Sequence, residues 1–308
     1  MIFGLTLYQI LWYFLEYSFI GWVVEVVYHA VAMGKIINRG FLNGPVCPIY
    51  GTGMLGVLML SNVITSALTD AGVGSHSVRL LCIFAGGTLF ATAVELAGGW
   101  ILDKLFHARW WDYSDRKFNL NGYICPEFSL LWGLGIVAVV EIVHPLLAVE
   151  PTHGIIAHAA GIIILAVLYT VLVIDIVATV LTIRGLNKKL AEIDEISAAI
   201  RQGSDFITDK VGNSAYKTTV KLEESAVQAR LGYAELTDKV ASDREEFDAM
   251  AENTRRELIA RRDRLYAELT KKRHFGVGRL LNAFPMVKHE KYAEALREIM
   301  EKRIGSLR

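Results

Sequence analysis

The chain has 308 residues, 53% of them hydrophobic, and its 32 Lys and Arg residues balance 32 Asp and Glu residues. The charges are unevenly placed, because residues 1–184 hold only 8 of the basic and 11 of the acidic residues. This pattern excludes a single uniformly soluble domain. It predicts a membrane domain at 1–184 followed by a solvated, charge-dense domain at 185–308.

Five apolar runs are long enough to cross a bilayer, which takes about 20 residues per helix. They lie near residues 4–33, 49–68, 79–106, 127–149 and 154–184. The first run lacks a basic start and a small-residue cleavage site, so we expect it to remain as a helix. The expected fold class is an all-α, polytopic membrane protein with about five transmembrane helices and a long cytoplasmic helical arm.

Basic residues near the ends of these runs predict their orientation. They gather after the first, third and fifth runs: Lys35, Arg39, Arg109, Arg116, Lys117, Arg184, Lys188 and Lys189. Such loops usually stay in the cytoplasm. The N-terminus is therefore predicted outside and the C-terminal arm inside, with Trp110, Trp111 and Tyr113 in an aromatic belt at the cytoplasmic interface.

Two stretches match without a gap at an offset of 78 residues, and nine of the 28 aligned positions from 21 to 48 are identical. The identical pairs start at Gly21-Trp22 and Gly99-Trp100 and end at Cys47-Pro48 and Cys125-Pro126. We interpret them as a duplicated two-helix unit, with copies at about 10–68 and 88–149.

Each copy places an acid and a histidine four residues apart, Glu25 with His29 and Asp103 with His107. This spacing puts both side chains on one helix face. Asn43-Gly44 and Asn121-Gly122 then favour a turn with positive φ. The Cys-Pro pairs suit a helix start, where the thiols of Cys47 and Cys125, if accessible, can have a lowered pKa.

Three interpretations of this motif remain open. The copies can face each other and form a solute or ion pathway, as in transporters built from repeats. His29, His107, Cys47 and Cys125 can bind zinc or copper, although no CxxC or HxxxH spacing supports a local site. Alternatively, the motif only forms turns and helix starts.

Further acids inside the apolar runs favour the pathway. Glu16 and Glu95 lie near mid-span, and Glu141 and Asp175 lie in the fourth and fifth runs. Because a charge in hydrocarbon costs several kcal/mol, such residues are expected to face the bundle interior. The pathway and binding candidates are Glu16, Glu25, His29, Asn43, Cys47, Glu95, Asp103, His107, Asn121 and Cys125.

The C-terminal arm carries a helical seam in which Leu186, Leu190, Ile193, Ile196 and Ile200 step by four, three, three and four. This spacing resembles a coiled coil. A second long helix is expected at 217–273 and a final helix at about 288–304. The seam predicts self-association or docking of a partner protein.

Residues 255–273 are strongly basic, which is compatible with binding to anionic lipid or nucleic acid. Acids interleave with these bases and no nucleic-acid motif is present, so we favour a solvated helix face and expect no nucleic-acid partner. No phosphate-binding loop, HExxH or GxSxG occurs. We therefore expect neither an enzyme nor a cofactor.

One block of the sequence runs from Asn38 to Gly51. A second block contains Trp111-Asp112-Tyr113-Ser114, Phe118 to Gly122 and Ile124-Cys125, with Ser129 and Trp132-Gly133. Both blocks resemble the CmpB-type family of putative ABC-transporter permeases, also called putative ABC-transporter type IV, and the second departs from the family pattern at Tyr123 and Pro126. The resemblance covers roughly residues 5–150. It implies a permease of the bacterial inner membrane whose ATPase is a separate chain.

The leading functional hypothesis is thus a permease component for a small solute or ion. Its acids would line a path between the repeats. The alternative is a membrane scaffold or sensor that acts through the arm, and a third hypothesis is a thiol or metal protein. The sequence names no substrate, direction or energy source.

Overall fold

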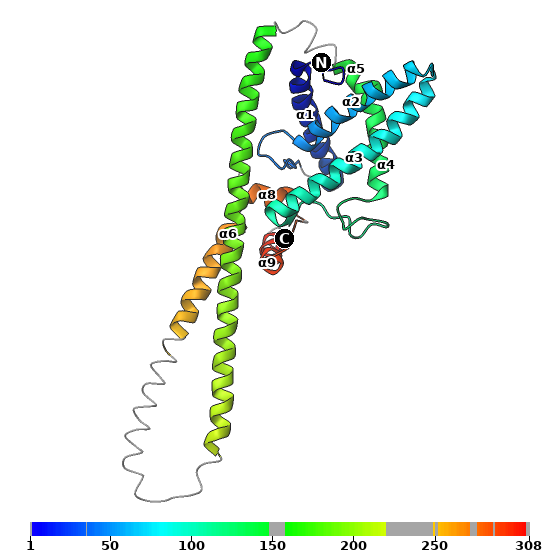
Figure 1. Cartoon of the computed structure of the whole chain (residues 1–308). Helices are drawn as coiled ribbons and strands as arrows, with labels where there is room; N and C mark the ends of the chain where they lie inside the picture. The colour runs from blue at the N-terminus through cyan, green and yellow to red at the C-terminus, as the bar shows by residue number, and fades with distance from the viewer. Residues whose placement is uncertain are drawn as a thin grey trace, which may run out of the picture. The chain divides into compact units, whose positions relative to one another are not determined.

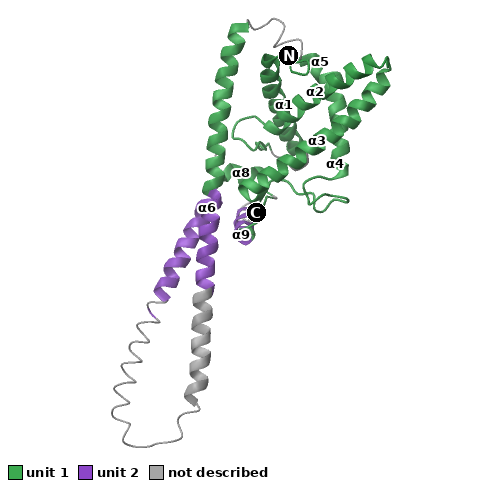
Figure 2. Ribbon diagram, viewed as in Figure 1, with its two compact units in different colours: residues 1–185, 272–293 green, residues 186–271, 294–308 purple. Residues whose placement is uncertain are grey.

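The computed structural model describes residues 2–34, 36–147, 158–219, 249, 252–271, 276–285 and 287–305. The chain forms two compact units: unit 1 comprises residues 1–185 and 272–293, and unit 2 comprises residues 186–271 and 294–308 (Figure 2). Four parts of the expected helices lie outside the described residues, at 148–149, at 154–157, at most of 217–251 and at 272–273.

Five helices are long and apolar enough to cross a membrane, which confirms the predicted number within the described chain. They are α1 (Leu7–Met33), α2 (Pro48–Asp70), α3 (His76–Phe106), α4 with its continuation (Pro126–Leu147) and the first part of α6 (His158–Thr219). The successive pairs α1 and α2, α2 and α3, and α3 and α4 pack against one another (Figure 1).

The helix ends follow from local sequence. Thr6 and Gln9 form a reciprocal capping box at the start of α1, and Gly34 ends this helix with a φ of 65°. Cys47 and Cys125 are the N-cap residues of α2 and α4, and a proline follows each of them at the first helical position. The predicted Cys-Pro helix starts are therefore confirmed, because proline has no N–H to leave unpaired there.

The fourth span is not a regular α-helix. Helix α4 (Pro126–Ala138) continues into a π-helical turn, η1 (Val139–Val143), and then into α5 (His144–Leu147). Pro145 cannot donate a backbone hydrogen bond, and the N–H of His144 reaches back five residues to the carbonyl of Val139. The wider turn places Glu141 beside Arg79 and His76 at the start of α3.

Helix α6 runs without interruption from His158 to Thr219, whereas the sequence suggested one helix to 184 and a second from 186. No proline or turn dipeptide separates the two predicted helices, so the backbone hydrogen bonds continue through residue 185. The change from an apolar to a charged surface takes place within a single helix.

Residues 276–293 belong to unit 1. Helix α8 (Val277–Ala283) lies within this segment, and strand β2 (Lys288–His289) pairs with β1 (Ala108–Arg109) directly after α3. The expected final helix at 288–304 is therefore wrong at its start, since α9 begins only at Ala293. Residues 288 and 289 adopt an extended backbone instead of a helix, because they form a strand that pairs with β1.

A small apolar core holds this segment in unit 1. Its buried members are Phe106, Ala108, Trp110, Ile183 and Leu280. Trp110 packs edge-on against Phe284 with ring centroids 4.9 Å apart. Trp110 was predicted in an interfacial aromatic belt, but it is only 8% exposed because the returning C-terminal segment covers it.

Unit 2 contains the residues of α6 after 185, a helix at 252–270 and α9 (Ala293–Gly305). The predicted seam is buried within this unit, and Leu190 and Ile193 are fully buried. Lys189 pairs with Glu268 at 2.5 Å and Arg261 with Glu192 at 2.6 Å. The pairing of Arg261 with Glu192 supports the interpretation of the basic stretch at 255–273 as a solvated helix face whose charges are balanced by acids.

Candidate functional site

Three intramembrane acids each accept a hydrogen bond from a tyrosine hydroxyl. The hydroxyl of Tyr50 donates to Glu25 at 2.6 Å, that of Tyr113 to Glu95 at 2.9 Å, and that of Tyr123 to Asp103 at 2.6 Å. Bonds from a neutral donor to a carboxylate are among the stronger hydrogen bonds in proteins. The acids lie on α1 and α3, and the tyrosines lie on the segments that follow those helices.

Two of these tyrosine–acid pairs, Tyr50 with Glu25 and Tyr123 with Asp103, are built in the same way around the glycine of the repeated Gly-Trp motif. In both copies a glycine lies four residues before the acid, at Gly21 and Gly99, and the ring of the donating tyrosine lies against that glycine. A Cβ atom on Gly21 would lie 2.2 Å from Cγ of Tyr50, and one on Gly99 would lie 3.0 Å from Cδ1 of Tyr123. Glycine therefore leaves the room that each ring needs to reach the acid one turn later.

The tyrosines themselves are not equivalent in the alignment, because residue 50 aligns with Phe128 and residue 123 aligns with Pro45. Sequence comparison of the copies could not find them for this reason. Tyr113 was predicted at the membrane interface as a belt residue, but its hydroxyl is bonded to Glu95. Burial and the nearby charges of Glu95 and Glu25 raise the pKa of Tyr113, so this hydroxyl keeps its proton at neutral pH.

The pairs around Glu25 and Glu95 lie close together and are joined by aromatic side chains. Tyr113 stacks on Phe128 with centroids 4.8 Å apart, and Tyr50 meets Trp132 edge-on at 5.8 Å. Trp132 also interacts with the carboxylate of Glu95. We call this set the acid–aromatic cluster: Glu25, Glu95, Tyr50, Tyr113, Phe128 and Trp132.

The charges of the three acids are compensated differently. Asp103 is 3% exposed and pairs with Nε of Arg109 at 3.3 Å. Glu25 lies within electrostatic range of Arg39, which instead donates its hydrogen bond to the carbonyl of Ala283. Among the described residues no basic side chain forms an ion pair with Glu95, which is 9% exposed and whose Oε2 has no hydrogen-bond partner.

The two predicted acid–histidine turns differ. His29 lies within α1, and its Nδ1 is 3.2 Å from the carbonyl of Glu25 and 4.0 Å from the Glu25 carboxylate. His107 instead ends α3 with a φ of 53°, so it no longer stands one helical turn after Asp103 on the same face. The chain turns there into β1, and the carbonyl of His107 accepts from the N–H of Glu290.

The two Asn-Gly turns also differ. Asn121 and Gly122 have φ values of 50° and 75°, as the sequence predicted. Asn43 and Gly44 are not among the described residues with positive φ. Their backbone N–H groups donate instead to the carboxylate of Asp175 on α6, at 3.0 and 2.7 Å, so an acid on another helix fixes this turn.

Arg279 completes the first turn from the distant helix α8. It is 6% exposed and donates to Oδ1 of Asn43 at 3.1 Å and to the carbonyls of Gly40 and Phe41 at 2.8 and 2.9 Å. Burial lowers the pKa of Arg279, and the charge of Asp175 opposes that shift. No local pattern identifies this residue, because it lies 236 positions from Asn43.

The cysteines are buried rather than reactive. Cys47 and Cys125 are 7% and 1% exposed. Burial, with a smaller effect from Glu25, raises the pKa of the Cys47 thiol to about 12, so the lowered pKa expected at a helix start does not develop there. Desolvation outweighs the effect of the helix N-terminus at this position.

The remaining predicted residues fall outside the acid–aromatic cluster. Glu16 lies nine residues before Glu25, which is about 13 Å along α1, and its buried Oε2 has no hydrogen-bond partner. Within the described residues no three His, Cys, Asp or Glu side chains are arranged to hold a metal ion. His29, His107, Cys47 and Cys125 are thus not gathered into such a group, and metal binding by them stays a prediction.

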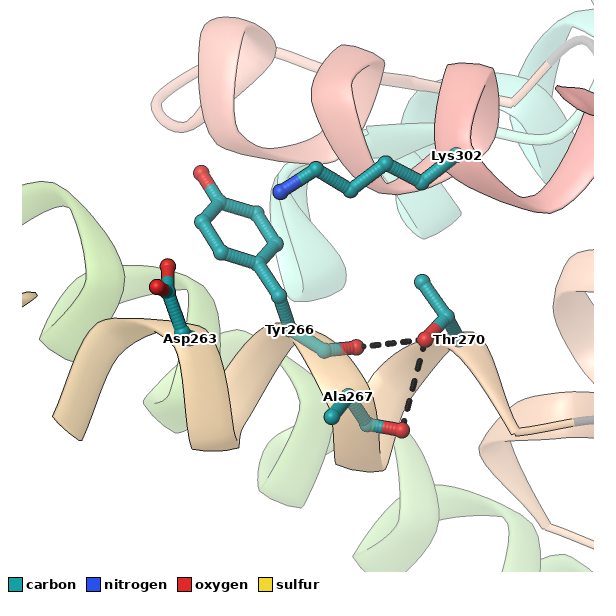
Figure 3. Close-up of a pocket in the computed structure, with 5 residues that line it drawn as sticks. All are labelled: Asp263, Tyr266, Ala267, Thr270 and Lys302. Carbon is teal, nitrogen blue, oxygen red and sulfur yellow. Dashed lines mark hydrogen bonds between the residues drawn. The ribbon is translucent and has the colours of Figure 1, made fainter. Parts of the chain in front are cut away.

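Unit 2 contains a separate polar cleft of about 410 Å³, lined by Asp263, Tyr266, Ala267, Thr270 and Lys302 (Figure 3). The amine of Lys302 lies 3.9 Å from the ring centroid of Tyr266, and the hydroxyl of Thr270 donates to the carbonyl of Tyr266. Lys302, the basic residue that lines the cleft, is therefore already in contact with the ring of Tyr266. We regard the acid–aromatic cluster as the candidate functional site.

Five membrane-length helices with acids buried between them define a multi-pass membrane protein. The chain matches the family described as Putative ABC-transporter type IV over residues 12–180. This match covers more than half of the chain, so the chain belongs to that family, the CmpB-type family that the two sequence blocks resemble. No curated protein and no solved structure matches the chain.

Proposed function

We propose that the chain is the membrane-spanning component of an ABC-type transporter and that a small solute or ion passes along the acid–aromatic cluster. Membership of the transporter family supports the first part. Glu95 supports the second, since a buried membrane acid without a paired base is costly and is usually kept for transport or proton transfer.

The cluster joins elements from both halves of the proposed repeat. Glu25 and Tyr50 come from α1 and α2, whereas Glu95 and Trp132 come from α3 and α4. A change in the packing of α2 against α3 would therefore change access to both acids. Asp103, paired with Arg109, is assigned a structural role at the end of α3.

The proposal also covers the orientation of the chain in the membrane and the energy source of transport. The distribution of Lys and Arg favours an outer N-terminus and a cytoplasmic arm in a bacterial inner membrane. The sequence holds no GxxxxGK[ST] loop, so ATP hydrolysis would require a separate ATPase subunit. No catalytic role is assigned to this chain.

Purification tests the partner directly. The full chain, carrying an affinity tag, is expressed in its own host, extracted in mild detergent and purified, and the eluate is analysed by mass spectrometry and for ATP hydrolysis. We expect a P-loop ATPase to co-purify in near-stoichiometric amount. An unrelated tagged membrane protein of similar abundance is the control, and purification of the chain without any ATPase would contradict the proposal.

A membrane scaffold or sensor remains the alternative function. It was suggested by the apolar seam of the arm, which was expected to be free to bind a partner. The seam residues of the arm are buried inside unit 2 by the chain itself, as Leu190 and Ile193 show. An apolar seam that is already covered offers less surface to a partner. A truncation after residue 185 would not separate the two hypotheses, because it would also remove Arg279 from unit 1.

A further inference from the structure

We infer that the acid–aromatic cluster binds an organic cation that carries an ammonium group. This inference rests on the proposed function, because it names the class of solute that would use the pathway. It depends on three properties of the described cluster, which are an unfilled acceptor, aromatic side chains beside it and too few ligands for a metal ion.

The unfilled acceptor is the carboxylate of Glu95. Its Oε1 accepts a hydrogen bond from the hydroxyl of Tyr113, and this bond orients the carboxylate toward the aromatic residues of the cluster. Trp132 also interacts with this carboxylate, yet Oε2 is buried and no donor among the described residues meets hydrogen-bond geometry with it. A buried carboxylate oxygen without a donor costs free energy, and a ligand N–H would supply the missing donor.

The aromatic side chains supply the second property. Tyr113 and Phe128 are stacked, and Tyr50 and Trp132 meet edge-on, so four rings lie beside the two tyrosine–acid pairs. Aromatic faces attract ammonium groups, and the attraction increases when the cation leaves water. An anionic solute would not gain an ion pair with Glu95, and a neutral solute would leave Glu95 without a base among the described residues.

The third property distinguishes an organic cation from a metal ion. Protein sites for divalent metals need several oxygen, nitrogen or sulfur ligands at short distance. Across the part of the chain that the structure describes, no three His, Cys, Asp or Glu side chains come together in this way. One free carboxylate oxygen surrounded by rings suits a single ammonium group instead.

Binding to the purified full chain tests the inference without a transport assay. The probes are butylammonium and choline, and the neutral control is 3,3-dimethyl-1-butanol, which has nearly the shape of choline but no charge. Thermal unfolding and isothermal titration are measured at constant ionic strength, with sodium as the balancing cation. We expect at least one ammonium probe to bind and to raise the unfolding temperature, and the neutral alcohol to do neither.

Variants locate the site. Glu95→Gln keeps an oxygen to accept from Tyr113 but removes the charge, and it is expected to weaken ammonium binding by on the order of 30-fold or more. Glu127→Gln is the matched control, because the side chain of Glu127 is 65% exposed on α4 and pairs with Arg116. Tyr113→Phe keeps the ring and is expected to retain binding, whereas Tyr113→Leu is expected to weaken it.

The outcomes separate this inference from the proposed function. If neither probe binds, or if the neutral alcohol binds as well as choline, the inference is wrong even when an ATPase co-purifies. Unchanged binding by Glu95→Gln would also overturn it. If the ammonium probes bind as expected and no ATPase co-purifies, the cation site stands and the transporter assignment fails.

Discussion

Replacing Arg279 with alanine is expected to expose the Cys47 thiol and to lower the free energy of unfolding of unit 1 by about 3–5 kcal/mol, the usual cost of breaking a buried charged contact. Arg279 donates to three acceptors in the turn at 40–43. Its removal leaves two carbonyls without this donor and leaves the charge of Asp175 without its nearby opposite charge. The turn should then separate from α8, which carries Arg279.

Labelling with a maleimide at neutral pH measures this exposure. Cys82 and Cys125 are first replaced with alanine, so that Cys47 is the remaining thiol of the chain. We expect slow labelling in this background, because Cys47 is 7% exposed, and faster labelling once Arg279→Ala is added. Thermal unfolding in detergent provides the stability change.

Arg297→Ala is the control for the loss of a positive charge, since the side chain of Arg297 is 72% exposed and pairs with Glu301 on the same helix. Surface pairs of this kind contribute about 0–1 kcal/mol. Equal labelling of Cys47 with and without Arg279, together with unchanged unfolding, would show that α8 does not hold the first turn.

Gly21→Ala is expected to displace Tyr50 from Glu25 and to destabilise the protein by about 1–3 kcal/mol, the usual cost of overpacking. The added Cβ would lie 2.2 Å from Cγ and 2.4 Å from Cβ of Tyr50. Those atoms are the base of the side chain, so the ring cannot swing away while its hydroxyl stays bonded to Glu25. Thermal unfolding of the purified chain in detergent measures the loss.

Two further variants separate the loss of the Tyr50–Glu25 hydrogen bond from the effect of adding a methyl group to a helical glycine. Tyr50→Phe removes only the hydrogen bond and should cost about 1 kcal/mol. Gly53→Ala is the matched glycine control, because no atom lies within 4 Å of the added Cβ and alanine favours a helix by up to about 1 kcal/mol over glycine. A loss for Gly21→Ala no greater than that for Gly53→Ala would disprove the close packing of Tyr50.

The sequence predicted the elements whose physical cause is local. The five apolar runs correspond to five membrane-length helices, and the Cys-Pro pairs start α2 and α4. Hydrophobic length and proline geometry act over a few residues, so they can be read directly from the chain. The repeat also directed attention to the correct helices, although its origin by duplication stays a prediction.

The site was only partly predictable, because its hydrogen-bond donors come from distant positions. Glu25 and Glu95 were named as candidates, but their partners Tyr50 and Tyr113 were not, since tyrosine in a membrane protein more often indicates an interface. Arg279 was missed entirely. Its partners lie in the turn at 40–43, and only the return of residues 272–293 to unit 1 brings them together.

Local signals also failed where tertiary packing opposed them. Asn43-Gly44 has the residues of a positive-φ turn, yet Asp175 binds its N–H groups and the turn takes another form. Cys47 stands at a helix start, yet burial raises the pKa of its thiol. In the first case a carboxylate on another helix, and in the second case burial of the thiol, outweighs the local preference.

Access of water to Glu95 tests the pathway most directly. In a chain whose three native cysteines are replaced with alanine, Glu95→Cys is compared with Leu89→Cys, which lies on the same helix with its side chain 73% exposed at the apolar surface. Membrane vesicles are treated with a membrane-impermeant cationic methanethiosulfonate reagent. We predict that the cysteine at 95 reacts while the one at 89, facing lipid, does not. Failure of the cysteine at 95 to react from either side of the membrane would contradict a path through the acid–aromatic cluster.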